Sequence, residues 1–168
     1  MKTWLRLLLV LATVGGGFAG LSTTTEVFGT LKEHGLAVEL VGLTSITLYA
    51  FVIASGLLFV YDSRLTGPML VAFALQIPWV SLPLFGYHFA AASYAVVTLG
   101  PPQWAGQIVT YGLSADLGAY FKFRFAAPQE GPWSVGINLF AVLLYVLLRL
   151  SVRASSRSPE PASTLPAG

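Results

Sequence analysis

The sequence predicts an α-helical membrane bundle of four transmembrane helices that carries a small extracytoplasmic antiparallel β-sheet between spans three and four. Of its 168 residues, 55% are hydrophobic and only 10% are charged, against about 25% charged residues in an average soluble domain. Four segments approach the about 20 apolar residues that cross a bilayer. Between the last two lies a segment whose apolar and polar residues alternate, which is typical of a strand.

The four predicted spans differ in clarity. The clearest is Leu36–Tyr61, whose only charged residue is Glu39. The third span, Pro68–Tyr87, opens with a proline at a position where the missing N–H is harmless in a helix. Trp133–Leu150 is the fourth span, and Trp4–Ser22 is the first and least apolar of them because it contains four glycines.

The first segment also has features of a signal peptide, since two basic residues precede an apolar run and small residues follow it. We favour a retained helix over a cleaved signal. Ala12, Gly16 and Gly20 recur every fourth residue, and such a small-residue face allows another helix to pack closely.

The basic residues predict the orientation of the chain in the membrane. With the N-terminus inside, the cytoplasmic side holds Lys2, Arg6, Arg64, Arg149, Arg153 and Arg157, and the outside holds Lys32, Lys122 and Arg124. This excess of inside charge follows the positive-inside rule and places both termini in the cytoplasm. A bacterial cytoplasmic membrane is the expected location. The tail Ser151–Gly168 is rich in Ser, Pro and Ala and is predicted to be disordered.

The outward segment 88–132 is too long for a simple connection and predicts structure of its own. Alternation places Phe121, Phe123 and Phe125 on one strand face and Lys122 and Arg124 on the other. We expect a β-hairpin over 107–126. A third strand is expected at 94–99, and the threonine-rich run 23–25 is a possible fourth.

The five residues of segment 121–125 are the candidate contact surface. They would meet a partner protein or anionic lipid headgroups. The alternative is an ordinary solvated strand, whose charges prevent pairing with another edge strand.

Glu39, Gln76 and Asn138 are the candidate functional polar residues within the predicted spans. Glu39 is interpreted either as a cation or proton site or as an acid that stabilises a helix N-terminus. Gln76 and Asn138 are predicted either to hydrogen-bond across helices or, with Pro78 and Pro83 interrupting span three, to line a transport path.

Little in the sequence points to catalysis. The absence of cysteine excludes disulfides, thiolate metal sites and cysteine nucleophiles. His34, His88 and Glu39 could form a two-histidine, one-carboxylate metal site, but their spacing is not diagnostic, and we expect no cofactor. The scattered basic residues exclude a nucleic-acid-binding face.

These observations support three hypotheses. The first is a non-enzymatic structural or interaction protein that contacts membrane lipid and a protein partner or a second copy of itself. The second is an oligomeric small transporter or channel that uses Gln76 and Asn138. The third is a membrane enzyme or metal site at the outer boundary.

Overall fold

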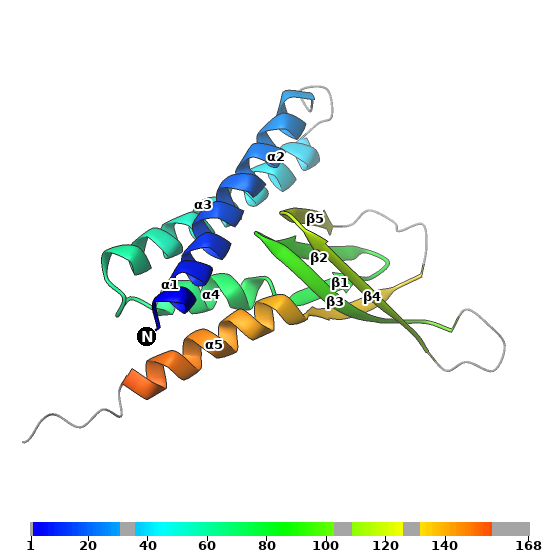
Figure 1. The fold of residues 1–168 in the computed structure, drawn as a ribbon. Coiled ribbons are helices and arrows are strands. Elements are labelled where there is room, and N and C mark those ends of the chain that lie inside the picture. Colours follow the sequence, from blue (N-terminus) through cyan, green and yellow to red (C-terminus); the bar gives the residue numbers. More distant parts are fainter. Residues whose placement is uncertain (1, 31–35, 103–108, 126–131, 156–168) are drawn as a thin grey trace, which may run out of the picture.

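The computed structural model describes residues 2–30, 36–102, 109–125 and 132–155. A group of helices and a six-stranded antiparallel sheet lie side by side (Figure 1). Two helical stretches of the described chain, Thr3–Thr25 and Val38–Tyr61, are long and apolar enough to cross a membrane, by length and composition. The predicted four-span bundle with a small sheet is therefore wrong, because spans three and four are each divided between a helix and one or two strands of the six-stranded sheet.

The N-terminal helical stretch consists of α1 (Thr3–Val10), the π-helical segment η1 (Leu11–Gly15) and α2 (Gly16–Thr30). It packs closely against α3 (Leu36–Tyr61), whose bounds are those predicted. A Cβ atom on Gly20 would lie 2.1 Å from Cε1 of Tyr49, and one on Gly56 would lie 2.4 Å from Oγ1 of Thr13. The two helices are therefore antiparallel and approach closely at glycines.

The threonine-rich run 23–25 is helical, so the prediction of a strand there is wrong. Thr24 lies in α2, and its hydroxyl donates to the Gly20 carbonyl one turn earlier, at 2.8 Å. Its β propensity is overridden by this backbone bond and by packing on α3, where Thr24 also shares a hydrogen bond with Ser45.

The third predicted span divides into α4 (Gly67–Leu75), β1 (Pro78–Ser81) and β2 (Phe85–Ala90). Pro78 and Pro83 account for the division, because proline lacks an amide donor and disfavours helical backbone in the residue before it. Leu82 and Phe85 close the turn between the strands, with the Leu82 N–H donating to the Phe85 carbonyl at 2.7 Å.

The fourth predicted span divides into β6 (Ser134–Asn138) and α5 (Leu139–Ser155). Asn138 marks the change, since its side-chain oxygen accepts from the Phe140 N–H at 3.2 Å and caps the first turn of α5. α5 continues through Ser155, into the tail predicted to be disordered, and residues 156–168 lie outside the described part of the chain.

The sheet has the strand order β4-β3-β6-β1-β2-β5, which includes β3 (Ser93–Gly100), β4 (Thr110–Leu117) and β5 (Tyr120–Phe125). The strands predicted at 94–99 and 121–125 are present, but the hairpin predicted over 107–126 is wrong. β4 pairs with β3 and β5 pairs with β2, so these consecutive strands lie at opposite ends of the strand order. Gly118, with a φ of 144°, lies in the short link between them.

The sheet is strongly curled, as the contacts between aromatic rings of distant strands on one of its faces show. The ring centroids of Tyr94 in β3 and Tyr120 in β5 are 5.6 Å apart, although β6, β1 and β2 lie between these strands in the order. Trp79 of β1 approaches each of the two tyrosine rings to 5.2 Å. The face carrying these rings is the inner face of a cup, and the opposite face is the outer face.

Two apolar clusters hold the molecule together. The first joins α1, α3, α4 and α5 through buried residues that include Leu9, Phe59, Met69 and Leu148. The second joins α3 to the outer face of β2 and β5, where Tyr49 lies 5.2 Å from Phe89 between ring centroids. The sheet thus attaches near the middle of α3 rather than at its end.

Candidate functional site

The sheet has an unusual distribution of polar and apolar side chains. Directly paired residues of neighbouring strands share a face, so the registers assign each residue of β6, β3 and β4 to a side. The outer face is mainly apolar: its large side chains are Val97, Leu99, Tyr111, Leu113, Leu117, Val135 and Ile137, all of them exposed, and Ser93, Ala95 and Ala115 lie between them. Leu117, Tyr111 and Leu113 are the most exposed of them, at 88%, 87% and 77%.

The inner face of the same three strands is mainly polar. It carries Thr98, Thr110, Ser114, Asp116, Ser134 and Asn138, with Tyr94, Val96 and several glycines between them. A sheet in water normally turns its apolar face to the core and its polar face to solvent. Membrane β-structures show the reverse, with apolar residues outside and polar residues inside.

Aromatic rings fill the centre of the cup. Trp79 stacks on His88 with ring centroids 4.4 Å apart and an interplanar angle of 8°. Tyr120 lies over the same tryptophan at 22°, and Trp79 and His88 are only 9% and 7% exposed. The rings contact one another directly, so this cluster is a packed core of the cup.

His88 is neutral at physiological pH. Burial, and then the charges of Lys122 and Arg124, lower its pKa to about 4. Lys122 lies directly opposite His88 in the pairing of β2 with β5. Neither ring nitrogen has a hydrogen-bond partner among the described residues. An imidazole this buried is poorly placed for proton exchange with a substrate.

The candidate contact residues of β5 have different roles. Phe121 packs on Phe89 edge-on at 6.2 Å, and Phe123 packs on Phe85 in the same way at 6.0 Å. Arg124 donates to the Leu82 carbonyl at 2.9 Å, which ties β5 to the turn between β1 and β2.

Phe125 and Lys122 remain exposed on β5. They are therefore the members of the candidate surface that are best placed for a partner. As predicted, the phenylalanines and the two cations lie on opposite faces of the strand.

The predicted intramembrane polar residues hold the junction of helices and sheet. The Gln76 side chain donates to the Ala72 carbonyl at 3.0 Å and accepts from the Ala91 N–H at 2.8 Å. The Asn138 oxygen accepts from the Ala95 N–H at 3.2 Å as well as capping α5. Glu39, in contrast, is exposed in the first turn of α3.

The hypothetical metal site is not assembled by the described residues. His34 lies outside them, while His88 is buried in the sheet and Glu39 lies at the start of α3. Within residues 2–30, 36–102, 109–125 and 132–155, no group of three His, Asp or Glu side chains could hold a metal ion.

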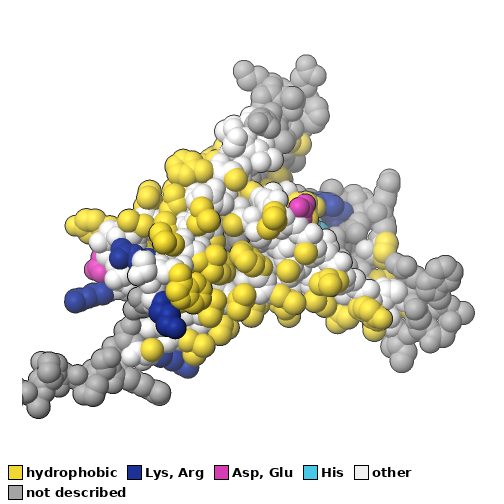
Figure 2. All heavy atoms as spheres, in the orientation of Figure 1, with side chains coloured by type: hydrophobic (Ala, Val, Ile, Leu, Met, Phe, Trp, Pro, Cys, Tyr) yellow, Lys and Arg dark blue, Asp and Glu magenta, His cyan; other side chains and the backbone are white. Residues whose placement is uncertain are grey.

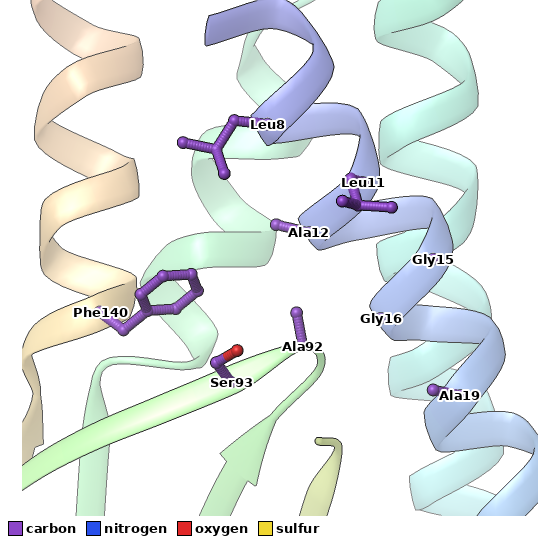
Figure 3. A pocket seen from close by; sticks show the side chains of 9 residues that line it. All are labelled: Leu8, Leu11, Ala12, Gly15, Gly16, Ala19, Ala92, Ser93 and Phe140. Carbon is purple, nitrogen blue, oxygen red and sulfur yellow. The ribbon is translucent and has the colours of Figure 1, made fainter. Parts of the chain in front are cut away.

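A groove lies between the N-terminal helix and the start of α5 (Figure 3). Leu8 and Ala12 line one side, Phe140 of α5 lines the other, and Ala92 of the β2–β3 turn and Ser93 at the start of β3 lie at its base. Its volume is about 420 Å³. Sequence patterns could not reveal it, because its lining comes from three distant segments.

The predicted small-residue face divides between three neighbours. Gly20 lies against Tyr49 of α3, and Gly16 lies against the β2–β3 turn, where a Cβ atom would come within 2.7 Å of the Ala92 Cβ. Ala12 is buried in the first apolar cluster and also lines the groove.

Basic residues gather at the end of the helices farthest from the sheet, as Figure 2 shows. We call this the basic end, formed by Lys2, Arg6, Arg64, Arg149 and Arg153. Arg6 donates to the Val60 carbonyl at 2.9 Å, which brings the start of α1 to the end of α3. Leu148 of α5 packs in the same apolar cluster as Leu5, so Arg149 and Arg6, the residues that follow them in the chain, belong to the same end of the molecule.

Comparisons with protein-family models, curated proteins and solved structures found no match to this chain.

Proposed function

We propose that this chain is a small integral membrane protein of structural or interaction type, anchored by α1–α2 and α3. In this proposal its curled sheet lies partly within the depth of the bilayer and contacts lipid through the apolar outer face. The observation that carries the proposal is that β6, β3 and β4 have an exposed, apolar outer face and a mainly polar inner face, the reverse of a sheet in water.

The attachment of the sheet supports this depth. Its β2–β3 turn contacts Gly16, which lies 13 residues after Thr3, or about 20 Å along a helix. The hydrocarbon core of a bilayer is about 30 Å thick. If α1–α2 crosses the membrane, the turn lies well inside the hydrocarbon region, where an exposed sheet surface must be apolar.

The apolar surface continues from the sheet onto α5. Leu139, Leu143, Val146 and Leu150 are exposed along this helix, while Ala141, Leu144 and Leu148 are buried on its other side. Large contiguous apolar patches are rare on soluble monomers. Lipid would cover the whole of this surface without a separate partner for each part.

The contacts of Gln76 and Asn138 favour a structural role over the transport hypothesis. Each uses its side chain to satisfy backbone groups at the junction of helix and sheet. Replacing either one should therefore loosen the junction. The basic end, by the positive-inside rule, would face the cytoplasm.

The absence of cysteine makes single-cysteine labelling a direct test. Leu113→Cys reports on the apolar outer face, and Ser63→Cys, in the exposed turn after α3, reports on the basic end. We expect a charged maleimide to label Ser63→Cys only from the cytoplasmic side. It should label Leu113→Cys only after denaturation in detergent, because a thiol in lipid neither ionises nor meets the reagent.

Two results would contradict the proposal. One is release of the protein from membranes by alkaline carbonate. The other is labelling of Leu113→Cys in sealed vesicles as rapidly as that of Ser63→Cys. A disulfide-linked dimer of Leu113→Cys would instead identify a second copy as the cover of this face.

A further inference from the structure

We propose that the groove and the basic end together bind one anionic phospholipid, with an acyl chain in the groove and the phosphate headgroup at the basic end. This inference rests on the proposed membrane location. It adds a specific ligand class to a surface that would otherwise contact lipid without selection.

The groove suits an acyl chain. Its lining is apolar apart from the Ser93 hydroxyl, and its volume of about 420 Å³ falls in the roughly 300–1,000 Å³ range of ligand sites. Leu11 and Ala19 on its helical wall are exposed, so a chain can enter from the surrounding lipid. An α-helix about 10 Å wide would fill this volume in roughly one turn, which argues against a docked helix.

The basic residues lie where the headgroup of the same molecule would be. Both walls of the groove lead to the basic end, since Lys2 and Arg6 precede Leu8 on α1, and Arg149 follows Phe140 on α5. Lys2 is about 9 Å from Leu8 along the helix, and Arg149 is about 14 Å from Phe140. One leaflet supplies about 15 Å of hydrocarbon, so a single lipid can reach both regions.

The charge balance at the basic end favours an anion. Among the described acids, Asp62 is the nearest to these cations in the sequence. Its carboxylate accepts a hydrogen bond from the backbone N–H of Arg64 at 2.8 Å. Arg149 donates to the Tyr145 hydroxyl at 3.2 Å on its own helix. Clusters of cations next to membrane helices attract anionic headgroups, by about 1 kcal/mol for each Lys or Arg.

The test uses the full chain in phosphatidylcholine nanodiscs that contain a small fraction of spin-labelled phosphatidylglycerol or spin-labelled phosphatidylcholine. Electron paramagnetic resonance measures the motionally restricted lipid of each type. We expect the parent protein to prefer phosphatidylglycerol. Replacing both Arg149 and Arg153 by glutamine should lower this preference by about fivefold for each cation.

A second variant tests the groove itself. Ala19→Phe places a ring over the exposed part of the groove and should reduce restricted lipid of both types. Leu7→Phe is the matched control, because Leu7 is exposed on the same helix and does not line the groove.

Two outcomes would overturn the lipid site. One is an unchanged phosphatidylglycerol preference in the double arginine variant, and the other is an equal effect of Ala19→Phe and Leu7→Phe. Failure of the proposed membrane location would look different, since the parent protein would then not enter nanodiscs of pure phosphatidylcholine.

Discussion

Replacing Leu113 by arginine places a charge at the centre of β4 on the apolar outer face. The Leu113 side chain is 77% exposed, so the substitution removes little packing within the protein. Its effect on stability therefore measures the surroundings of the face. In water, a surface substitution of this kind changes the unfolding free energy by about 0.5 kcal/mol or less. On the lipid face of a membrane β-structure, arginine costs about 2–4 kcal/mol near the bilayer centre and about 0–1 kcal/mol near the interface.

We expect a loss of about 2 kcal/mol or more for Leu113→Arg in phosphatidylcholine vesicles. Urea unfolding followed by the fluorescence of the four tryptophans measures this loss. Ser114→Arg is the matched control, because Ser114 is the next residue of β4 and belongs to the inner face. Equal unfolding free energies for Leu113→Arg and the parent protein would refute the assignment of this face to the hydrocarbon region.

Three further predictions concern packing and titration. Gly20→Leu should destabilise the helix pair by about 1–3 kcal/mol through overpacking against Tyr49. Gly67→Ala should be neutral or stabilising, because no atom lies within 4 Å of the new Cβ. Thermal unfolding compares the two variants, and equal losses of stability would contradict the close approach of α2 to α3 at Gly20. Asn138→Leu should lower stability by about 1–3 kcal/mol, since the Phe140 N–H loses its helix cap and the Ala95 N–H loses its acceptor. Circular dichroism would show the loss as a lower melting temperature. An unchanged melting temperature would contradict the structural role of Asn138. The pKa of His88 is lowered to about 4 in the folded chain, so the unfolded chain takes up the proton first as the pH falls. The free energy of unfolding should therefore decrease as pH drops from about 6.5 to about 4. His88→Phe should flatten this part of the pH–stability curve, and the same slope in both proteins would assign the pH dependence to other groups.

The sequence predicted some elements well because their signal is local. Leu36–Tyr61 is a single apolar run, and the helix has those bounds. The alternation at 121–125 likewise identified a strand. Residues 68–87 were misassigned because hydropathy reports an apolar environment and not the backbone conformation. Pro78 and Pro83 were the available signal that a helix could not continue through this region.

The arrangement of the candidate sites could not be predicted from local patterns. Trp79 and His88 become neighbours through the β1–β2 hairpin, and Tyr94 meets Tyr120 only because the sheet curls. The groove likewise depends on Phe140 reaching a helix that lies more than a hundred residues earlier in the chain. These contacts follow from strand order, which a single sequence does not specify.

The position of β6 has a consequence for how the chain assembles during synthesis. The last strand to leave the ribosome lies between β3 and β1, in the middle of the strand order. Until residues 134–138 emerge, β3–β4 and β1–β2–β5 are two separate sheets, each with an unpaired edge next to apolar surface. Such intermediates are prone to wrong pairing. The nascent protein should therefore need protection until residues 134–138 have emerged, and a chain that ends before β6 should be a substrate for protein quality control.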